Sequence, residues 1–521
     1  MPREIVISLL PQQAHNFENV RLSTARYLGI KTSPLGKVLI TRKSIDARRG
    51  KIKVNIGLKV YDLHESIIDS FPQFQYQDVR KSPEVIVVGS GPAGLFASLR
   101  LIELGIKPII VERGKDIASR KRDVAALNRN KGFEPESNFA FGEGGAGTFS
   151  DGKLYSRSRK RGDINRILKI LHLHGAQDEI LYEAHPHIGT NVLPRVISSV
   201  RKTIEEHGGE VIFNTKVTGI EIINGVSKGV LLADDRNIAG KAVILSTGHS
   251  ARDIYYSFHQ QGIQLEAKPF AMGVRVEHPQ ELIDTIQYHG MSRGEFLPAA
   301  TYSLAQQVNG RGVYSFCMCP GGYIVPAVSG FNEVVVNGMS PSKRNSQWAN
   351  SGIVVEIQLS DLKSYSKHGI LAGIEFQRDL EELAFKQVMS GVAAPAQRLT
   401  DFVSRKFSSN LPICSYHPGV ISSRLDQWMP MDIVNRLQAG FKEFDKKMKG
   451  FLTSEAQVLG VESRTSSPLR IPRNPDTFQH INVKGLFPCG EGAGYAGGIV
   501  SSAIDGERCA EALYQWIKSN P

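Results

Sequence analysis

The sequence has little cysteine and no long hydrophobic run. Only five of its 521 residues are cysteine, too few for the disulfide framework of a secreted protein, which favours a reducing compartment. No uncharged apolar run approaches the roughly 18 residues of a membrane-spanning helix. The opening residues, MPREIVISLLPQQ, also lack the basic start and apolar stretch of a secretion signal. We therefore expect a cytoplasmic protein without a transmembrane segment.

The sequence also lacks the ligand spacing of a metal site. Cys414, Cys489 and Cys509 are scattered singly along the chain. His185 and His187 form the pair HPH, but no carboxylate or cysteine stands at ligand spacing from them. We therefore expect no bound metal.

Acidic residues are fewer than basic residues. The chain has 63 lysines and arginines against 51 acidic residues, a net charge of +12. Two basic clusters can attract phosphate, nucleic acid or an anionic membrane. Because no aromatic residues interleave them, we favour a solvated basic face over a nucleic-acid partner. The clusters are Arg42, Lys43, Arg48, Arg49, Lys51 and Lys53, and then Arg157, Arg159, Lys160 and Arg161.

The most informative stretch that is present reads KSPEVIVVGSGPAGLFASLRLIELGIKPIIVERG, from Lys81 to Gly114. Its run Val85–Val88 is typical of a strand buried on both faces. Gly89, Gly91 and Gly94 follow in the spacing G-x-G-x-x-G, ahead of a helical pattern and a second strand. In this spacing the first glycine permits a tight turn, the second lets backbone approach a pyrophosphate, and the third lets the helix pack on the strand.

Glu112 ends that second strand, about 20 residues beyond the first glycine. A carboxylate there can accept hydrogen bonds from a ribose hydroxyl, while the helix N-terminus holds the phosphates. The same glycine spacing recurs at residues 142–147 and 492–497. Only the match at Gly89 has strand, helix, second strand and acidic residue together, and we interpret residues 142–147 as a glycine loop. The stretch therefore predicts one dinucleotide-binding site.

A small α+β module is predicted ahead of this site. Strand-like and helical patterns alternate there, and the stretch from Ser70 to Pro83 is interpreted as a linker because it contains two prolines and is polar. The predicted elements are the strands Arg3–Leu9, Lys37–Thr41 and Lys51–Leu58 and the helix Asn16–Leu28.

Two distant segments are predicted to complete the nucleotide-binding domain. In the first, a strand pair turns at Asn224-Gly225 and a last strand ends in Ser246-Thr247-Gly248. From about Phe270 the pattern changes to short alternating runs with helices near Leu371–Val388 and Met431–Phe444. Near Gly460 it returns to glycine-rich sequence. That second segment is predicted to hold a strand at Leu486–Pro488 and a closing helix at Ser501–Ile517.

Three landmarks resemble flavoproteins of the glutathione-reductase type. They are the turn Gly89–Gly94, the pair Thr247-Gly248 and the pair Gly490-Glu491. Four further blocks, FGEGGAGTFSDGKL, FCMCPGGYIVPA, NGMSPSKRNSQWAN and VESRTSSPLRIPR, resemble the uncharacterised FAD-dependent dehydrogenase family of bacteria and plastids. The resemblance covers most of the chain and implies a cofactor and a fold, but no substrate.

Pattern and resemblance together predict an α/β fold. We expect a discontinuous Rossmann-type FAD-binding domain with an inserted α+β domain and a small N-terminal α+β module. The predicted boundaries are 1–75 for the module, 82–269 and 456–521 for the two FAD-binding segments, and 270–455 for the inserted substrate domain.

The resemblance also implies which residues contact FAD. The glycine turn would meet the pyrophosphate, Glu112 the adenosine ribose, Arg113 the adenine, and Gly498 with Ile499 the flavin edge, where the positive end of the last helix stabilises the reduced anion. The full expected set is Gly89, Ser90, Gly91, Pro92, Ala93, Gly94, Glu112, Arg113, Gly144, Gly145, Ala146, Gly147, Thr148, Val217, Thr247, Gly248, Gly490, Glu491, Gly498 and Ile499.

Four side chains are candidates for catalysis. Cys317 and Cys319 form a C-x-C whose thiols face the same way on a strand, so they are structural thiols, a substrate-facing or redox pair, or part of a metal site. Lys153 would lie over the flavin or pair with Asp151. His417 is a candidate proton donor, although a histidine before proline is often a loop residue.

These patterns predict an FAD-dependent oxidoreductase that transfers hydride between flavin N5 and a small molecule. Two alternatives remain. One is a tRNA- or RNA-associated flavoprotein that docks through the basic N-terminal module, and the other is a reductase of isoprenoid lipids. Because no second G-x-G-x-x-G or G-x-G-x-x-A lies between Thr148 and Gly460, any NAD(P)H is expected to bind only transiently. The sequence does not indicate an oligomeric state.

Overall fold

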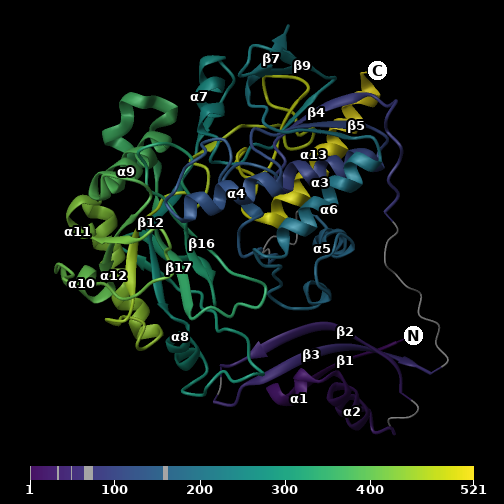
Figure 1. The fold of residues 1–521 in the computed structure, drawn as a ribbon. Helices are drawn as coiled ribbons and strands as arrows, with labels where there is room; N and C mark the ends of the chain where they lie inside the picture. Colours follow the sequence, from purple (N-terminus) through teal and green to yellow (C-terminus); the bar gives the residue numbers. More distant parts are fainter. Residues whose placement is uncertain (1, 32–34, 49, 64–73, 156–161, 521) are drawn as a thin grey trace.

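The computed structural model describes residues 2–31, 35–48, 50–63, 74–155 and 162–520 (Figure 1). Among these residues, no helix combines the length and apolar character that crossing a bilayer requires. Of the basic clusters, Arg49, Arg157, Arg159, Lys160 and Arg161 lie outside the described residues.

A five-stranded parallel sheet forms the centre of the nucleotide-binding half, in the order β22-β10-β4-β5-β6. Because strand residues alternate between faces, Val85 and Val87 of β4 pack in one core, while Ile86 and Val88 pack in another on the opposite side. The strands are β4 (Glu84–Val88), β5 (Lys107–Val111), β6 (Glu210–Ile212), β10 (Val243–Leu245) and β22 (Leu486–Pro488).

Helices and a small antiparallel sheet cover the two faces. The first and last helices of this half, α3 and α13, pack against each other although they are far apart in sequence (Figure 1). The helices are α3 (Pro92–Glu103), α4 (Ile117–Asn128), α5 (Ile164–Leu173), α6 (Leu193–Glu206), α7 (Arg252–Gln260) and α13 (Ile499–Ser519), with 3-10 turns η1 (Gly145–Gly147) and η3 (Asp178–Leu181). The small sheet contains β7 (Val217–Ile223), β8 (Val226–Leu232) and β9 (Asn237–Ala239).

The hairpin between β7 and β8 turns where the sequence predicts. Asn224 and Gly225 both have positive φ, +53° and +74°, as a two-residue hairpin turn requires. The α/β fold with a parallel sheet, predicted from the glycine-rich stretch, is confirmed.

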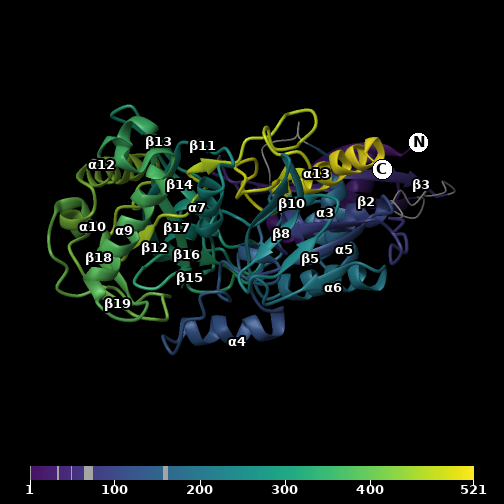
Figure 2. The same ribbon diagram turned by 90° about the horizontal axis from the view of Figure 1, so that it is seen from above.

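The inserted half is built on a seven-stranded sheet, mostly antiparallel, in the order β13-β14-β17-β12-β20-β18-β19. Figure 2 shows this half beside the nucleotide-binding half. Its sheet strands are β12 (Phe270–Pro279), β13 (Ala305–Val308), β14 (Arg311–Cys319), β17 (Trp348–Ile357), β18 (Ala394–Arg398), β19 (Val420–Ser422) and β20 (Gln457–Glu462).

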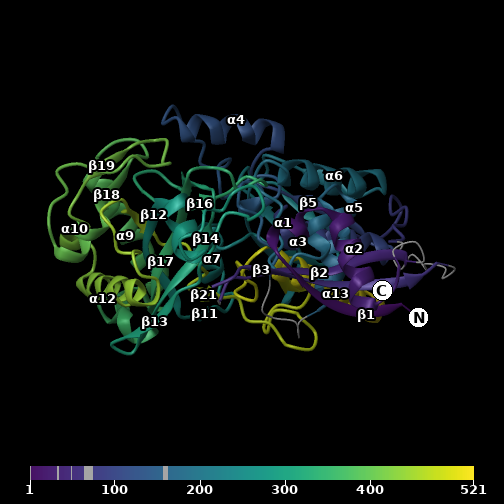
Figure 3. The same cartoon turned by 90° about the horizontal axis from the view of Figure 1, so that it is seen from below.

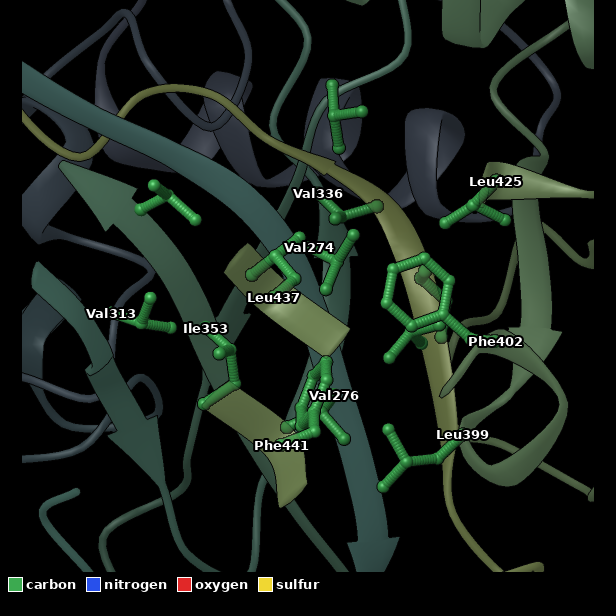
Figure 4. Close-up of a cluster of buried hydrophobic side chains, with 14 of the residues drawn as sticks. Val274, Val276, Val313, Val336, Ile353, Leu399, Phe402, Leu425, Leu437 and Phe441 are labelled. Carbon is green, nitrogen blue, oxygen red and sulfur yellow. The ribbon is translucent and has the colours of Figure 1, made fainter. Parts of the chain in front are cut away.

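Short pairs and helices complete this half. The pairs are β15 (Tyr323–Pro326) with β16 (Val336–Met339) and β11 (Glu266–Ala267) with β21 (Leu469–Arg470). The helices are α8 (Gln280–Gln287), α9 (Ala372–Val388), α10 (Leu399–Ser404), α11 (Leu425–Trp428) and α12 (Met431–Lys447), with the 3-10 segment η4 (Leu359–Leu371). Leu437 and Phe441 of α12 pack against Val276 and Ile353 of the sheet, which fixes α12 on one face (Figure 4).

One predicted boundary differs from the structure. The second FAD-binding segment was expected to begin at residue 456, but β20 (Gln457–Glu462) pairs with β12 and β18 in the inserted sheet. The strand is buried along its whole length, so its glycine-containing sequence QVLGVE belongs to that core. The chain rejoins the parallel sheet only at β22.

The N-terminal module is a three-stranded antiparallel sheet, β1-β3-β2, with its own small core. Figure 3 shows it in front of the nucleotide-binding half. The backbone of Lys43 exchanges hydrogen bonds with Tyr182 and Ala184 of that half. Its elements are β1 (Arg3–Leu9), α1 (Pro11–His15), α2 (Phe17–Leu28), β2 (Leu35–Asp46) and β3 (Lys53–Asp62). In the first basic cluster, Lys43 is paired with Glu183 and Arg48 with Asp46.

Candidate active site

A cleft of about 420 Å³ lies at the carboxyl ends of β4, β5 and β10 and extends to the inserted sheet. In open parallel sheets, ligands bind at this edge of the strands. The end residues Val88, Val111 and Ser246 line one wall, and Phe316 and Cys317 of β14 line the other. The cleft is therefore bounded by both halves of the molecule.

The glycine turn after β4 has the geometry that its spacing predicts. Gly89 has a φ of +97°, and a Cβ at Gly94 would lie 2.0 Å from the carbonyl oxygen of Gly89. The third glycine therefore lets α3 pack closely on the strand. A Cβ at Gly91 would have its nearest neighbour 4.0 Å away, and among the described residues no side chain caps α3 there. The start of α3 thus faces the cleft as bare backbone.

Glu112 is held by the protein on all sides. Its carboxylate accepts hydrogen bonds from the backbone N–H of Ser90, Gly114 and Gly142, at 2.9, 2.9 and 3.0 Å, and from the Ser90 hydroxyl at 2.8 Å. It joins the glycine turn to the second glycine loop, and it is 5% exposed. The ribose contact stays a prediction, because a carboxylate has about four acceptor positions and a ribose hydroxyl must share or replace one of these donors.

The loop at residues 138–147 is organised by Arg120 of α4. Its buried guanidinium donates hydrogen bonds to the carbonyl oxygens of Asn138, Phe139, Gly142, Glu143 and Gly145. Burial lowers the pKa of Arg120 to about 10. The sequence identified the loop but not the arginine that holds it, since 18 to 25 residues separate donor and acceptors.

The start of α13 forms the far end of the glycine-lined wall. Gly498 has a φ of +110°, and a Cβ placed on it would have no described atom within 4 Å. The carboxylate of Glu491 accepts a hydrogen bond from the N–H of Gly498 and lies 3.3 Å from Nδ1 of His249. The Glu491 side chain therefore orients the backbone at the helix N-terminus.

Most of the predicted FAD contacts line this one cleft. Those that do are Gly89, Gly91, Pro92, Ala93, Glu112, Arg113, Gly145, Ala146, Gly147, Val217, Thr247, Gly248, Glu491, Gly498 and Ile499. Ser90, Gly94, Gly144, Thr148 and Gly490 do not line it and instead support the lining from behind. The hydroxyl of Thr148, for example, donates to the carbonyl of Glu143.

Sequence reasoning missed several lining residues, among them His249, Asn337 and Arg464. A signal was present for each. His249 directly follows the pair Thr247-Gly248, and the other two stand in or beside the blocks NGMSPSKRNSQWAN and VESRTSSPLRIPR.

Three of the four catalytic candidates meet at the other wall. Lys153 lines the cleft, and its Nζ lies 3.3 Å from Asp151, 3.7 Å from the sulfur of Cys317 and 3.6 Å from that of Cys319. Cys317 also lines the cleft, whereas Cys319 is fully buried behind it. The sequence left two alternatives for Lys153, a position over the flavin or pairing with Asp151. In the structure Lys153 pairs with Asp151 and also lies on the cleft.

The structure does not bring His417 into the cleft. It lies on an exposed loop just before β19, and β19 is the outer edge strand of the inserted sheet. Its position does not support the predicted role as a proton donor.

The two scattered cysteines Cys489 and Cys509 come together in space, with Asp505 between them. Arg473 donates hydrogen bonds to both oxygens of Asp505, at 2.5 and 3.0 Å, and lies 3.3 Å from the sulfur of Cys509. A guanidinium thus stands where a metal ion would have to bind.

The backbone at Gly91, Gly248 and Gly498 shows whether the cleft has room for a dinucleotide. At each position a Cβ would meet open space, with no described atom closer than 4.0 Å. Two helices, α3 and α13, begin at Gly91 and Gly498. The uncapped N-terminus of α3 suits phosphate, and the N-terminus of α13, whose Gly498 N–H is bonded to Glu491, offers its positive end to the electron-rich edge of a flavin. The residues present fit FAD.

Comparisons with known proteins agree with this geometry. Residues 82–129 match a family described as "FAD binding domain", and residues 269–465 match one described as "FAD-dependent protein, C-terminal domain-like". Residues 1–61 match a domain of unknown function. A Clostridium beijerinckii protein named "Uncharacterized protein" is 40% identical over 507 residues, 94% of each chain.

Similar solved structures are more distant. A flavin-dependent brominase has a TM-score of 0.36 at 13% identity, covering 84% of this chain and 80% of its own. A geranylgeranyl bacteriochlorophyll reductase-like protein from Thermoplasma acidophilum has a TM-score of 0.34 at 15% identity, covering 84% and 79%. From its relative and its matched domains, the chain belongs to a family of FAD-dependent proteins, and FAD is its cofactor.

Proposed function

We propose that the protein is an oxidoreductase in which hydride passes between FAD and a small molecule bound in the cleft between the two halves. The observation that supports this is the lining of the cleft. One wall is mostly backbone at two helix N-termini, with Glu491 at the start of α13, and the other carries an ammonium and a thiol. Such a division suits a cofactor on one side and a substrate on the other.

The glycine wall has the groups to bind and orient the cofactor. The start of α3 at Gly91 would hold the pyrophosphate, and the start of α13 at Gly498 would face the flavin edge, where its positive end favours negative charge. This assignment follows the glutathione-reductase type of FAD domain. When bound, FAD supplies the two-electron chemistry.

The second wall has the groups to place and dehydrate a substrate. Lys153 offers a positive charge at the cleft, with its side chain 35% exposed, and Phe316 excludes water beside Cys317. A substrate between this wall and the flavin would be shielded from solvent, which strengthens electrostatic contacts.

The test is anaerobic reduction of the flavin in the purified protein. We expect one class in a panel of small metabolites, which includes a polyprenyl diphosphate, to bleach the flavin absorbance. A Lys153→Met variant that retains FAD should be bleached more slowly. If no member of a broad panel reduces the flavin, or reoxidises it after chemical reduction, the proposed hydride transfer is wrong.

The alternative of RNA docking receives a separate arm of the test. Neutralising Arg48, Arg49 and Lys51 should not change flavin reduction under our proposal. Salt-dependent RNA binding that is lost in this variant would favour the docking function instead.

A further inference from the structure

The two thiols of the C-x-C motif converge on one ammonium. Strand β14 is irregular between Phe316 and Cys319, and Cys317 has a φ of +48°, in the left-handed region. This bulge re-aims the end of the strand, so that the sulfurs of Cys317 and Cys319 lie 3.7 and 3.6 Å from Nζ of Lys153. Bulges are common next to active sites, where they change the direction of a side chain.

The charges around Lys153 do not balance without a thiolate. Arg344 donates to both oxygens of Asp151, at 3.2 and 2.7 Å, and Arg275 pairs with Glu462 at 2.8 Å. Asp151 is thus the partner of Arg344, and Glu462 is the partner of Arg275. Lys153 is a third cation that shares Asp151 with Arg344, and its other acceptors are the two sulfurs.

The remaining titratable groups do not supply the missing negative charge. His187 faces the same cluster, and burial with the nearby Arg344 lowers its pKa to about 4, which keeps the ring neutral. Burial raises the pKa of Glu462 to about 7, so this carboxylate is at most partly charged near neutrality. A half-buried cation is stabilised by a paired anion, and one ionised thiol provides it.

The contacts and exposure favour Cys317 as the thiol that ionises. The S–H of Cys319 has an acceptor in the carbonyl oxygen of Cys317 at 3.3 Å, although its sulfur also lies 3.5 Å from Nη2 of Arg275. The pKa of the Cys317 thiol lies well below its ordinary value because of hydrogen bonding from Cys319 and the charges of Lys153 and Arg275, although burial opposes the shift. Cys317 also lines the cleft, whereas Cys319 does not.

We propose that Cys317 is a thiolate at neutral pH, held by Lys153, and that it adds to an electrophilic carbonyl carbon of the substrate. The S–C bond forms as the π electron pair of the C=O bond moves to the oxygen, which takes up a proton from water. The catalytic part of this proposal rests on the proposed function, since the substrate must lie between Cys317 and FAD. The ionisation of Cys317 stands on the cluster alone. A thiolate beside a cation at a partly open position is the microenvironment of a reactive cysteine.

The test uses iodoacetamide on the FAD-loaded protein, with peptide mass spectrometry to read each cysteine. In this reaction the sulfur forms a bond to carbon and iodide leaves with its electron pair. We expect Cys317 to be modified at nearly the same rate at about pH 6 and about pH 8, since it is already ionised. Cys414 is a matched internal control, because burial raises its pKa to about 11 and its rate should be low.

Three variants sharpen the test. Lys153→Met should slow the modification of Cys317 at about pH 6 by roughly tenfold or more, whereas Lys153→Arg should retain most of the rate. Cys319→Ser keeps a hydroxyl donor and should leave Cys317 ionised.

A second measurement does not depend on access of the reagent. The ultraviolet absorbance of the thiolate, taken as wild type minus Cys317→Ser, should titrate well below the ordinary thiol pKa of about 8.5. A midpoint above about pH 7 would overturn the proposal, because Cys317 would then be mostly protonated at neutral pH. A protein that shows the low midpoint but no flavin reduction would refute the hydride function and leave the thiolate in place.

Discussion

The two walls of the cleft use different parts of the chain. The nucleotide-binding wall presents backbone, because Gly91, Gly248 and Gly498 leave open space where a side chain would be. The opposite wall presents side chains, Cys317 from the inserted half and Lys153 from a loop of the nucleotide-binding half, which face the same space. Backbone N–H groups bind in the same way at every pH, whereas an ammonium and a thiol depend on their surroundings. The comparison predicts that FAD binding and the chemistry proposed for the opposite wall are separable in this molecule.

The largest effect is expected when a side chain is added to the nucleotide-binding wall, which presents backbone. Gly91→Asp places a carboxylate and a Cβ at the start of α3, against the expected pyrophosphate. We expect purified protein without FAD, a loss of affinity of at least about 100-fold, or roughly 2.7 kcal/mol. Gly132→Asp is the matched control, since Gly132 lies in an exposed loop with open space around it. A normal flavin spectrum in Gly91→Asp would contradict the site.

The backbone wall should also depend on the arginine behind it. Arg120→Met removes the donor to five carbonyl oxygens in the buried loop. Unsatisfied buried groups are costly, so we expect a loss of roughly 3–5 kcal/mol in the free energy of unfolding, measured by denaturant titration. Arg122→Met, an exposed position on the same helix, should change stability by less than about 0.5 kcal/mol. Equal stabilities of the two variants would show that Arg120 is not needed to stabilise the loop at residues 138–147.

In the inserted half, buried titratable groups should make the free energy of unfolding depend on pH. Burial raises the pKa of Glu277 in β12 to about 7, although Ser415 donates two hydrogen bonds to it. Because this folded-state pKa lies above the unfolded value of about 4.3, the contribution of Glu277 is fully present below that pH and is lost as pH rises to about 7.

The Glu277→Gln variant should therefore lack this loss. Relative to wild type, it should gain roughly 2–3 kcal/mol in the free energy of unfolding between about pH 4.5 and pH 8. Glu281→Gln, at an exposed position of α8, serves as the control and should follow the wild-type curve. Parallel curves for Glu277→Gln and wild type would show that Glu277 is ionised in the folded protein.

Removal of the thiols should leave the backbone wall intact. The double change Cys317→Ser with Cys319→Ser affects only the opposite wall, so FAD affinity should change by less than about tenfold, or 1.4 kcal/mol. Fluorescence titration of the apoprotein with FAD measures this. Complete loss of FAD would show that the two walls are not separable, and that the predicted division near Phe270 is wrong.

The smallest effect is expected for nicotinamide nucleotides. The inserted half is built on a mostly antiparallel sheet, and its sequence has no second glycine turn of the nucleotide-binding type. We therefore expect NADPH to bind only transiently, with a dissociation constant roughly in the high micromolar to millimolar range. A tight, stoichiometric site in a calorimetric titration of the FAD-loaded protein would contradict this.

Local patterns predicted the nucleotide-binding half well. Val85–Val88, the glycine turn and the strand before Glu112 lie within some 30 residues, so short-range spacing carries their geometry. The same reasoning failed for β20, whose glycine resembles the glycine-rich sequence after it but whose burial places it in the inserted sheet. It also failed for His417, because a sequence does not show which strand lies at an edge.

The nucleotide-binding wall of this protein could be predicted from the sequence alone. Glycine spacing is a local property, and the turn at Gly89–Gly94 needs only its neighbours to expose backbone at a helix start. Only the tertiary structure decided which side chains face that wall. Lys153 and Cys317 are 164 residues apart, and Arg120 contacts carbonyls up to 25 residues away. Their ionisation and orientation depend on burial and on partners that meet only after folding, because the charges that act on them come from separate elements.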